Sequence, residues 1–405
     1  MVRMLNAANP APTDPGLRIR SIDAIRGFAL FGVMLVNMYN FGAWSPEWAG
    51  AVDHTFNTLM HSVFETKSLR LFSILFGFGF ALQLSRILSD PEGSLWIYIR
   101  RLVILFIFGM AHALIFDGDI LMQYAMLGLI LVAFQNFPGK LLLTLSVVLL
   151  LAFPFGNLVH EPNYEDVLNE AEDRLPLSVQ RENHPYLGTP MEVFEENVEA
   201  IPPRIWEDLH QPESSLAIFS MFLLGFWLGR VRVIQNDSKN PALINKVFYW
   251  SAGVGVVAGL LEWWLQYRLG YAVYSGNVAS PGVRLMGDLL FTYGSTALAL
   301  AYGAGIVMLS RKSGWETILR PFQKLGKMAL TVYLSSSLLF TTLFYGWGFG
   351  QLNLLGPMAT TLYALLFFVM LAAFSSWWLS RFRFGPVEWL WRSLTYLELQ
   401  PMRRK

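Results

Sequence analysis

The chain has 405 residues, of which 54% are hydrophobic, 15% are aromatic and only 15% are charged. Soluble globular domains carry about 25% charged residues, so this composition indicates a membrane protein. The net charge of +1 gives no electrostatic basis for binding nucleic acid. Because the sequence contains no cysteine, disulfides and thiolate metal sites are excluded.

Residues 1–17 are polar and rich in proline, and we expect a short disordered cytoplasmic tail rather than a signal peptide. Ten apolar stretches follow that approach the roughly 20 residues needed to cross a bilayer. They lie at 22–43, 69–88, 98–116, 120–136, 140–158, 215–233, 246–268, 284–309, 326–348 and 357–380. We therefore predict an all-α integral membrane protein with about 10 transmembrane helices.

The distribution of Lys and Arg predicts the orientation of these spans. With the N-terminus in the cytoplasm, most basic residues fall in cytoplasmic loops, as the positive-inside rule requires. The loop 310–327 alone contains five of them, and the terminal residues 381–405 contain six more. Both termini are therefore predicted to be cytoplasmic, and 381–405 is predicted to be an amphipathic tail.

Residues 159–214 form one long loop that this orientation places outside the cytoplasm. The loop has 14 Asp or Glu and three Arg, and it separates two predicted five-helix halves at 18–158 and 215–380. Apolar residues between 193 and 209 predict an amphipathic helix lying over the membrane domain. This helix either covers an outward-facing site or is part of a surface linker.

The first span contains polar groups that hydrocarbon disfavours by at least a few kcal/mol. Asp23 and Arg26 are three residues apart and can pair on one helix face. Asn37 follows 11 residues after Arg26, on nearly the same face and about 16 Å further along the axis. Gly27 permits another backbone or a ligand to approach closely. The stripe is either a functional surface or an ion pair that only orients the helix.

The third span repeats this spacing, since His112 lies 11 residues after Arg101. Asp117 and Asp119 follow in a short turn, and Tyr124 begins the next helix. A histidine between apolar helices and an acidic turn can titrate near neutrality, as a general base must. The alternatives are a histidine that hydrogen-bonds helices together and an Asp119 that only caps the next helix.

Lys67 and Arg70 lie at the outer end of the second span, where the charge rule disfavours cations. We expect them near Asp117 and Asp119, in an ion-pair network or at an anionic acceptor. Glu262 and Asp288 are also within spans, but the sequence assigns them no partners. No group of residues has metal-ligand spacing, so no metal site is predicted.

Five separate motifs resemble the YeiB-like family of bacterial membrane proteins. The first is R-x-x-D-x-x-R-G-x-A-x-x-G-x-x-x-x-N, which begins at Arg20 and ends at Asn37. The others are L-F-S-I-L-F-G-F-G at 71–79, G-M-A-H-A-L-I-F-D-G-D-I-L at 109–121, G-K-M-A-L-T-V-Y-L at 326–334 and F-R-F-G-P-V-E-W-L-W-R at 382–392. The resemblance implies a multi-pass protein of the bacterial inner membrane.

The first helix is also similar to that of the transmembrane acyltransferase superfamily, which includes the heparan-glucosaminide acetyltransferase. Such proteins transfer an acyl group from cytoplasmic acyl-CoA to an acceptor across the membrane. Bacterial sugar acylators have Arg-x10-His here, where this chain has Asn37. The heparan enzyme has Asn followed 11 residues later by a catalytic His, where this chain has Trp48. His112 is therefore the first candidate to replace that histidine, and His54 is the second.

This resemblance implies acyl-CoA, or acetyl-CoA, as the donor and a hydroxyl or amine of a small molecule or glycan as the acceptor. The partners would be these ligands and the lipid bilayer, and a homodimer is left open. A transporter, or a lipid- or small-molecule-binding protein with a His112–Asp119 proton relay, is the alternative. The predicted catalytic residues are His112 as the general base, Asn37 as the amide donor that stabilises the oxyanion, and Asp119. Those predicted for acyl-CoA are Arg26, Asp23, Arg101, Lys327 and Lys324, and those for the acceptor are Asp117, Lys67, Arg70 and Tyr124.

Overall fold

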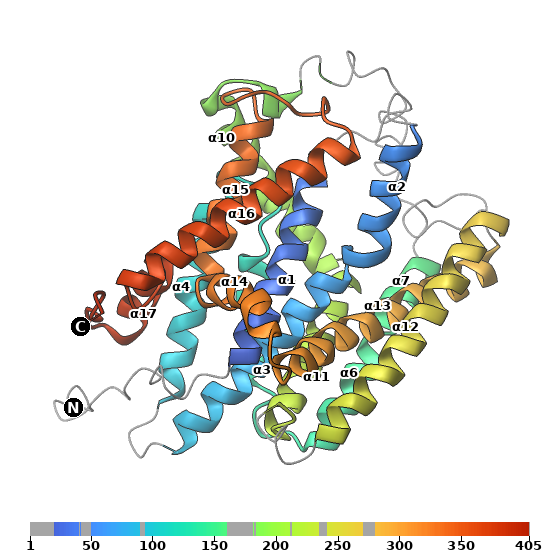
Figure 1. Cartoon of the computed structure of the whole chain (residues 1–405), viewed down its shortest axis with the longest axis horizontal. Coiled ribbons are helices and arrows are strands. Elements are labelled where there is room, and N and C mark those ends of the chain that lie inside the picture. Colours follow the sequence, from blue (N-terminus) through green and yellow to red (C-terminus); the bar gives the residue numbers. More distant parts are fainter. Residues whose placement is uncertain are drawn as a thin grey trace.

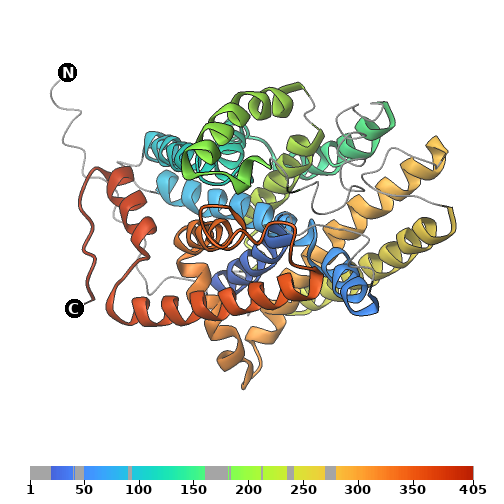
Figure 2. The same cartoon turned by 90° about the horizontal axis from the view of Figure 1, so that it is seen from above.

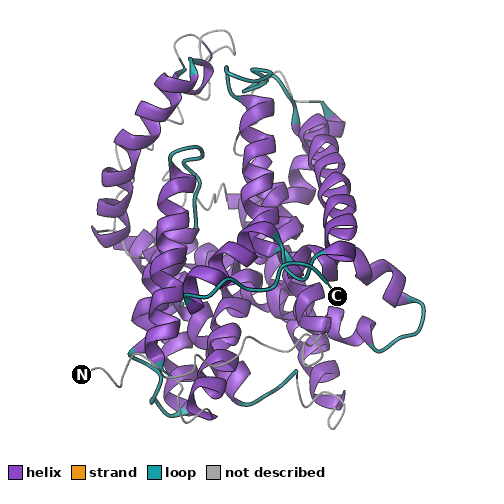
Figure 3. Cartoon of the chain, turned by 90° about the vertical axis from the view of Figure 1, so that its left-hand side faces the viewer, coloured by secondary structure: helices purple, strands orange, loops and turns teal. Residues whose placement is uncertain are grey.

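The computed structural model describes residues 20–39, 41, 50–89, 94–159, 181, 184–210, 213–234, 241–269 and 280–404. Regular structure in these ranges is helical, apart from one isolated antiparallel bridge between Phe382 and Arg403 (Figures 1 and 3). The predicted all-α fold class is confirmed. The helices used below are α1 (Arg20–Tyr39), α2 (Ala51–Leu59), η4 (Met60–Phe64), α3 (Lys67–Ser89), α4 (Leu95–Ala113), α5 (Leu121–Val132), α6 (Gly139–Leu149), α7 (Ala152–Val159), η5 (Pro185–Leu187), α10 (Pro190–His210), α11 (Glu213–Arg230), α12 (Pro241–Leu269), α13 (Pro281–Ser310), α14 (Trp315–Lys327), α15 (Ala329–Phe344), α16 (Pro357–Arg381) and α17 (Pro386–Tyr396).

The length and apolarity of these helices make the chain a multi-pass membrane protein. In the described ranges, seven helical segments are long and apolar enough to cross a membrane, or eight if α14 and α15 form one bent span. The seven are α1, α2 to α3, α4, α6 to α7, α12, α13 and α16.

Helices occupy all ten predicted stretches, but α5, α11 and α15 are not among the seven, and α5 and α15 are too short to cross alone. Helix α5 has 12 residues and α15 has 16, which correspond to about 18 and 24 Å at 1.5 Å per residue. The hydrocarbon core is about 30 Å thick. The structure therefore has fewer candidate membrane spans than the ten predicted from the sequence. Apolar sequence at 120–136 and 326–348 also arises because α5 and α15 are packed inside the protein.

Helix α1 packs directly against α14, which was predicted to be a cytoplasmic loop. A Cβ added at Gly27 would lie 1.9 Å from the Phe322 carbonyl oxygen, and one added at Gly326 would lie 1.9 Å from the Asp23 carbonyl oxygen. The sequence left open whether Gly27 admits a ligand or a backbone. In the structure, the backbone of α14 occupies the space beside Gly27.

Helices α14 and α15 meet at a bend of 86°, where one predicted span was placed. Glu388 of α17 caps the start of α15: its Oε1 accepts hydrogen bonds from the Leu330 and Thr331 amides at 2.7 and 3.0 Å. Its Oε2 accepts the Thr331 hydroxyl at 2.5 Å. The carboxylate thereby replaces the backbone partners that a continuous helix would provide.

Helices of the two predicted halves pack against each other. Helix α3 packs on α11, and a Cβ at Gly77 or Gly225 would lie 1.9 Å from a backbone carbonyl of the other helix. Helix α1 contacts α3, α13, α14 and α16. Helices α12 and α13 pair with each other and extend to one side of the molecule (Figure 2).

The segment between the halves contains the helix α10, at the top of Figure 1, away from α17 and the first residues of α1. We refer to the side of α10 as the outer side, as the charge pattern predicts. Asn197 of α10 donates to the Leu114 carbonyl at 3.2 Å, and Arg204 donates to the Asp119 carbonyl. Helix α10 therefore lies over the turn between α4 and α5. Residues 1–17 and 160–180 lie outside the described residues.

The topology predicts the response of reporter fusions. A reporter after Lys312 or at the C-terminus should report the cytoplasm, because both positions lie among the basic loops. A reporter inserted at Glu195 should report the opposite compartment, since α10 lies on the outer side. Alkaline phosphatase and green fluorescent protein fusions measure this, and a cytoplasmic signal at Glu195 would contradict the assigned orientation.

The contact between α1 and α14 predicts a sharp steric response. Gly27→Val should lower thermal stability, with a cost of about 1–3 kcal/mol for overpacking, because the Phe322 backbone cannot move away alone. Gly253→Val is the matched control, since a Cβ at that position would meet nothing within 4 Å. Melting temperatures of the detergent-purified variants measure the difference. Equal stability of both variants would refute the close contact.

Candidate functional site

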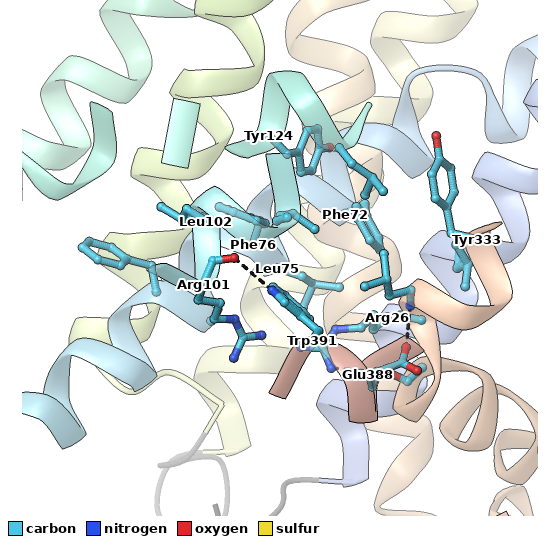
Figure 4. Close-up of a pocket in the computed structure, with 18 of the residues that line it drawn as sticks. Arg26, Phe72, Leu75, Phe76, Arg101, Leu102, Tyr124, Tyr333, Glu388 and Trp391 are labelled. Carbon is cyan, nitrogen blue, oxygen red and sulfur yellow. Dashed lines mark hydrogen bonds between the residues drawn. The ribbon is translucent and has the colours of Figure 1, made fainter. Parts of the chain in front are cut away.

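A cavity of about 210 Å³ lies between α1, α3, α4, α5, α14, α15 and α17 (Figure 4). Its middle is apolar, with Leu75, Phe76 and Leu102 on its wall. At one end are four basic side chains, which we call the cationic end. At the other are two tyrosines, which we call the tyrosine end. The cationic end is formed by Arg26, Arg101, Lys327 and Arg392, and the tyrosine end by Tyr124 and Tyr333.

The C-terminal helix α17 builds much of the cationic end. The Arg101 guanidinium lies 3.9 Å from the centre of the Trp391 ring, a cation–π geometry. The indole Nε1 of Trp391 donates to the Arg101 carbonyl at 2.9 Å. Residues 381–405 are therefore more than the amphipathic tail predicted from the sequence, because α17 closes the cavity beside α4.

Basic side chains outnumber carboxylates among the residues that line this end. Arg26 donates to the Asp23 carboxylate at 3.5 Å and to the Gly326 carbonyl at 3.4 Å. Glu388, which also lines the cavity, is fully engaged in capping α15. Burial raises the pKa of Glu388 above its ordinary value. Arg101 lies close enough to Arg26 and Arg392 for mutual repulsion. An anion at this end would relieve that repulsion.

His112 and Asp119 form a buried pair beside the tyrosine end. The His112 Nδ1 lies 2.8 Å from Asp119 Oδ1, and both side chains are at most 4% exposed. Because the carboxylate accepts, Nδ1 carries the proton, and in the neutral imidazole Nε2 is then an acceptor. Asp119 Oδ2 accepts the Met122 amide at 2.9 Å. Asp119 thus both caps α5 and orients His112, two roles that the sequence treated as alternatives.

Tyr333 connects this pair to the cavity. Its ring centre lies 5.1 Å from that of His112, and its hydroxyl accepts the Ile120 amide at 3.3 Å. Tyr124 is on the opposite wall, where its hydroxyl lies 2.6 Å from the Ser73 hydroxyl oxygen. In Figure 4 both tyrosines lie away from Arg101 and Trp391. His112 and Asp119 do not line the cavity directly.

The structure does not bring every predicted site residue to the cavity. Asn37 is half-buried on α1 and is not among the residues lining the cavity. Lys67 and Arg70 both contact the Phe291 ring of α13, at 5.6 and 5.7 Å. Asp117 is exposed and is an electrostatic neighbour of Tyr186.

The contacts of Lys67 and Arg70 differ from the expectation that they meet Asp117 and Asp119. Lys67 Nζ donates to the His61 carbonyl at 2.8 Å, and Arg70 donates to Thr296 Oγ1 at 2.9 Å. Glu262 of α12 is an electrostatic neighbour of Lys67. The physical reason is the position of α13, which packs on the face of α3 opposite the cavity. These cations therefore belong to a separate buried group.

Sequence reasoning missed Tyr333, Glu388, Trp391 and Arg392. All four lie in motifs at 326–334 and 382–392 that had carried only the family resemblance. An aromatic residue beside arginine, as at 391–392, was the available signal for a site. The position of α17 against α4 is a tertiary contact that the local sequence does not encode.

The chain matches one protein family and several full-length relatives. Residues 228–398 match a family described as a protein of unknown function, DUF418. The chain is 30% identical over 421 residues to the uncharacterized protein YxaH of Bacillus subtilis (strain 168), covering 97% of this chain and 98% of the relative. It is 28% identical over 390 residues to the uncharacterized protein YeiB of Escherichia coli (strain K12), covering 93% and 95%. No solved structure matches the chain.

A third relative is an uncharacterized 39.9 kDa protein from the amylase 3′ region of Bacillus acidopullulyticus, 28% identical over 394 residues and covering 96% of each chain. Each match runs over nearly the full length of both proteins, so the likeness includes α1, the cavity and α17. The chain belongs to the YeiB-like family of membrane proteins, whose C-terminal region is DUF418.

Proposed function

We propose that this protein is a transmembrane acyltransferase of the bacterial inner membrane. It would take an acyl group from cytoplasmic acyl-CoA and transfer it to a hydroxyl or amine on the outer side. The observation that carries the proposal is the layout of the cavity. One continuous space has guanidinium groups at its cytoplasmic end and leads to tyrosines beside a buried His–Asp pair at its other end.

The cationic end fits the phosphates of the donor. Arg26, Arg101 and Arg392 present forked donors, which suit phosphate oxygens and give charge-assisted hydrogen bonds. Trp391 is already stacked on Arg101, which fixes the direction of that guanidinium. Lys327 adds a fourth positive charge to the same wall.

The size of the cavity limits how the donor would bind. Pockets that enclose drug-sized ligands measure roughly 300–1,000 Å³, and this one is about 210 Å³. It can take a narrow arm such as pantetheine but not a whole CoA. The nucleotide would remain at the cationic end, and the thioester would reach the tyrosine end. Leu75, Phe76 and Leu102 would line the apolar part of that path.

His112 would act as the general base. The donor supplies an acyl group activated as a thioester. Nε2 of His112 would accept the proton of the acceptor hydroxyl or amine as that group attacks the acyl carbon. The imidazolium would be stabilised by Asp119, and its proton would pass to the departing CoA sulfur as the carbon–sulfur bond breaks.

A hydrogen-bond donor at the tyrosine end would stabilise the oxyanion. Asn37 was the residue predicted for this role, but Tyr333 lines the cavity and contacts His112. The Tyr333 hydroxyl donates to the Gly118 carbonyl at 3.4 Å, so it would have to turn from that long hydrogen bond to the oxyanion. Such a donor typically accounts for 10²–10³ in rate.

The transport alternative would use His112 and Asp119 as a proton relay. Release of free CoA from acyl-CoA distinguishes the enzyme from a transporter.

Donor binding should depend on the cationic end. Arg101→Ala should weaken the binding of CoA about tenfold or more, because charge-assisted phosphate contacts are stronger than neutral ones. Lys312→Ala is the control, as Lys312 is exposed on the same side and does not line the cavity. Equilibrium binding of radiolabelled CoA to the purified protein measures this. Equal affinity in Arg26→Ala, Arg101→Ala and Lys312→Ala would remove CoA from the cationic end.

Turnover should depend on His112 and, to a lesser extent, on Asp119. His112→Ala should leave CoA binding intact and lower the release of free CoA from acetyl-CoA by 10²–10⁴, the usual contribution of an acid–base group. Asp119→Asn keeps a polar group for the Met122 amide but removes the charge, so it should also lower turnover. Thiol release and melting temperature are measured on one preparation. A loss of stability with normal turnover per folded molecule would identify His112 as a packing residue instead.

A further inference from the structure

Three buried polar atoms without partners lie on the outer side, under α10. They are His112 Nε2, Asn197 Oδ1 and the Tyr345 hydroxyl oxygen, each lacking a hydrogen-bond partner in the described part of the chain. The three residues are 5%, 1% and 0% exposed. An unpaired buried polar group costs about 1–3 kcal/mol, so native proteins contain few. Three near one turn indicate a ligand site rather than simple packing.

Contacts of all three residues lead to the turn between α4 and α5. Asn197 donates from Nδ2 to the Leu114 carbonyl at 3.2 Å. The Tyr345 ring stacks on Tyr186 at 4.8 Å between centres, and Asp117 is an electrostatic neighbour of both tyrosines. Residues from α4, α10 and the end of α15 therefore surround the same few residues, which include the proposed base.

The chemistry of these atoms defines what they can bind. Since His112 Nδ1 is committed to Asp119, its Nε2 accepts. Since Asn197 Nδ2 is committed to Leu114, its Oδ1 also accepts. The Asp117 carboxylate is a third acceptor. Burial and the charge of Asp117 raise the pKa of Tyr345 above its ordinary value, so its hydroxyl keeps its proton. The complementary ligand carries several O–H or N–H donors.

The charge of the outer side restricts the ligand further. The segment 159–214 has 14 acidic residues and three Arg in its sequence, and six of those acids with one Arg are on α10, an excess of negative charge that repels anions. Two of those arginines are used on the backbone: Arg181 donates to the Gly350 carbonyl at 3.0 Å, and Arg204 donates to the Asp119 carbonyl. They are therefore not free to neutralise an anionic ligand.

We propose that α10 and the turn between α4 and α5 form the acceptor site, and that it takes a neutral or cationic molecule rich in hydroxyl or amino groups. A sugar or amino sugar without phosphate or carboxylate has this chemistry. Asn197 and Tyr345 hold the acceptor, and His112 takes its proton. The assignment rests on the proposed acyl transfer, because it defines the other substrate of the same base.

Three probes that share one ring and differ in charge test this site: D-glucose, D-glucosamine and glucose 6-phosphate. Transfer of radiolabelled acetyl from acetyl-CoA should reach glucose or glucosamine with a kcat/KM at least tenfold above that for glucose 6-phosphate. A preference between the first two distinguishes a hydroxyl from an amine acceptor. Preferential use of glucose 6-phosphate, or no transfer to either uncharged or cationic sugar by a protein that hydrolyses acetyl-CoA, would overturn the proposal.

Two variants localise the site. Asn197→Ala should raise the KM for the sugar about tenfold while kcat changes little and CoA affinity not at all. Tyr345→Phe removes only the hydroxyl and keeps the ring on Tyr186, so it covers the case in which Asn197→Ala misfolds. Glu199→Ala is the control, because Glu199 is exposed on the same helix. An unchanged KM in both variants would show that the sugar binds elsewhere.

Equilibrium dialysis of the three radiolabelled sugars without acetyl-CoA separates this inference from the proposed function. Binding of glucose or glucosamine that Tyr345→Phe weakens would support the site even in a protein that neither binds nor hydrolyses acetyl-CoA. In that outcome the acyl transfer fails and the outer site stands. CoA binding and hydrolysis together with no sugar binding would give the reverse result.

Discussion

The backbone contact between α1 and α14 is the constraint on which the rest of the site depends. Two glycines, Gly27 and Gly326, bring the helices so close that neither position can hold a side chain without displacing the other helix. Arg26, next to Gly27, then reaches the Gly326 carbonyl, which places its guanidinium at the cavity. Because α14 is held there, the chain must bend by 86° to enter α15.

That bend determines both ends of the cavity. It leaves the first amides of α15 without helical partners, and Glu388 of α17 supplies them. Helix α17 is thereby fixed beside α4, with Trp391 on Arg101. The same bend directs α15 outward so that Tyr333 meets His112. A change in the α1–α14 contact would therefore disturb the cationic end and the tyrosine end together.

The two ends suit different chemistry because their electrostatics differ. Basic residues exceed carboxylates at the cytoplasmic end, where the carboxylates of Asp23 and Glu388 are already hydrogen-bonded. On the outer side acidic residues exceed basic ones, and the acceptor atoms of His112 and Asn197 are unpaired in the described structure. An anionic donor and a neutral or cationic acceptor would thus approach from opposite sides of one base. A proton relay would not require the cationic end, which is why we propose an enzyme rather than a transporter.

The sequence by itself determined the helical class and the multi-pass membrane character of the chain, and it led to the prediction of several site residues. Long apolar stretches require helices in a bilayer, since only internal hydrogen bonds satisfy the backbone there. Charged residues inside such stretches are costly, so Arg26, Arg101 and His112 were recognisable one at a time. The 11-residue spacing from Arg101 also placed His112 near the outer end of the third span, with Asp119 in the turn that follows.

Tertiary structure decided which of these residues meet. The sequence grouped Lys67 and Arg70 with Asp117, but the packing of α13 on α3 gives those cations other partners. It gave Asn37 the oxyanion role, whereas the bend before α15 brings Tyr333 to the cavity instead. It described 381–405 as a tail, although α17 closes the cationic end. Helical periodicity predicts which residues share a face, but which face meets which neighbour depends on close contacts such as those of Gly27 and Gly326, made between residues some 300 positions apart.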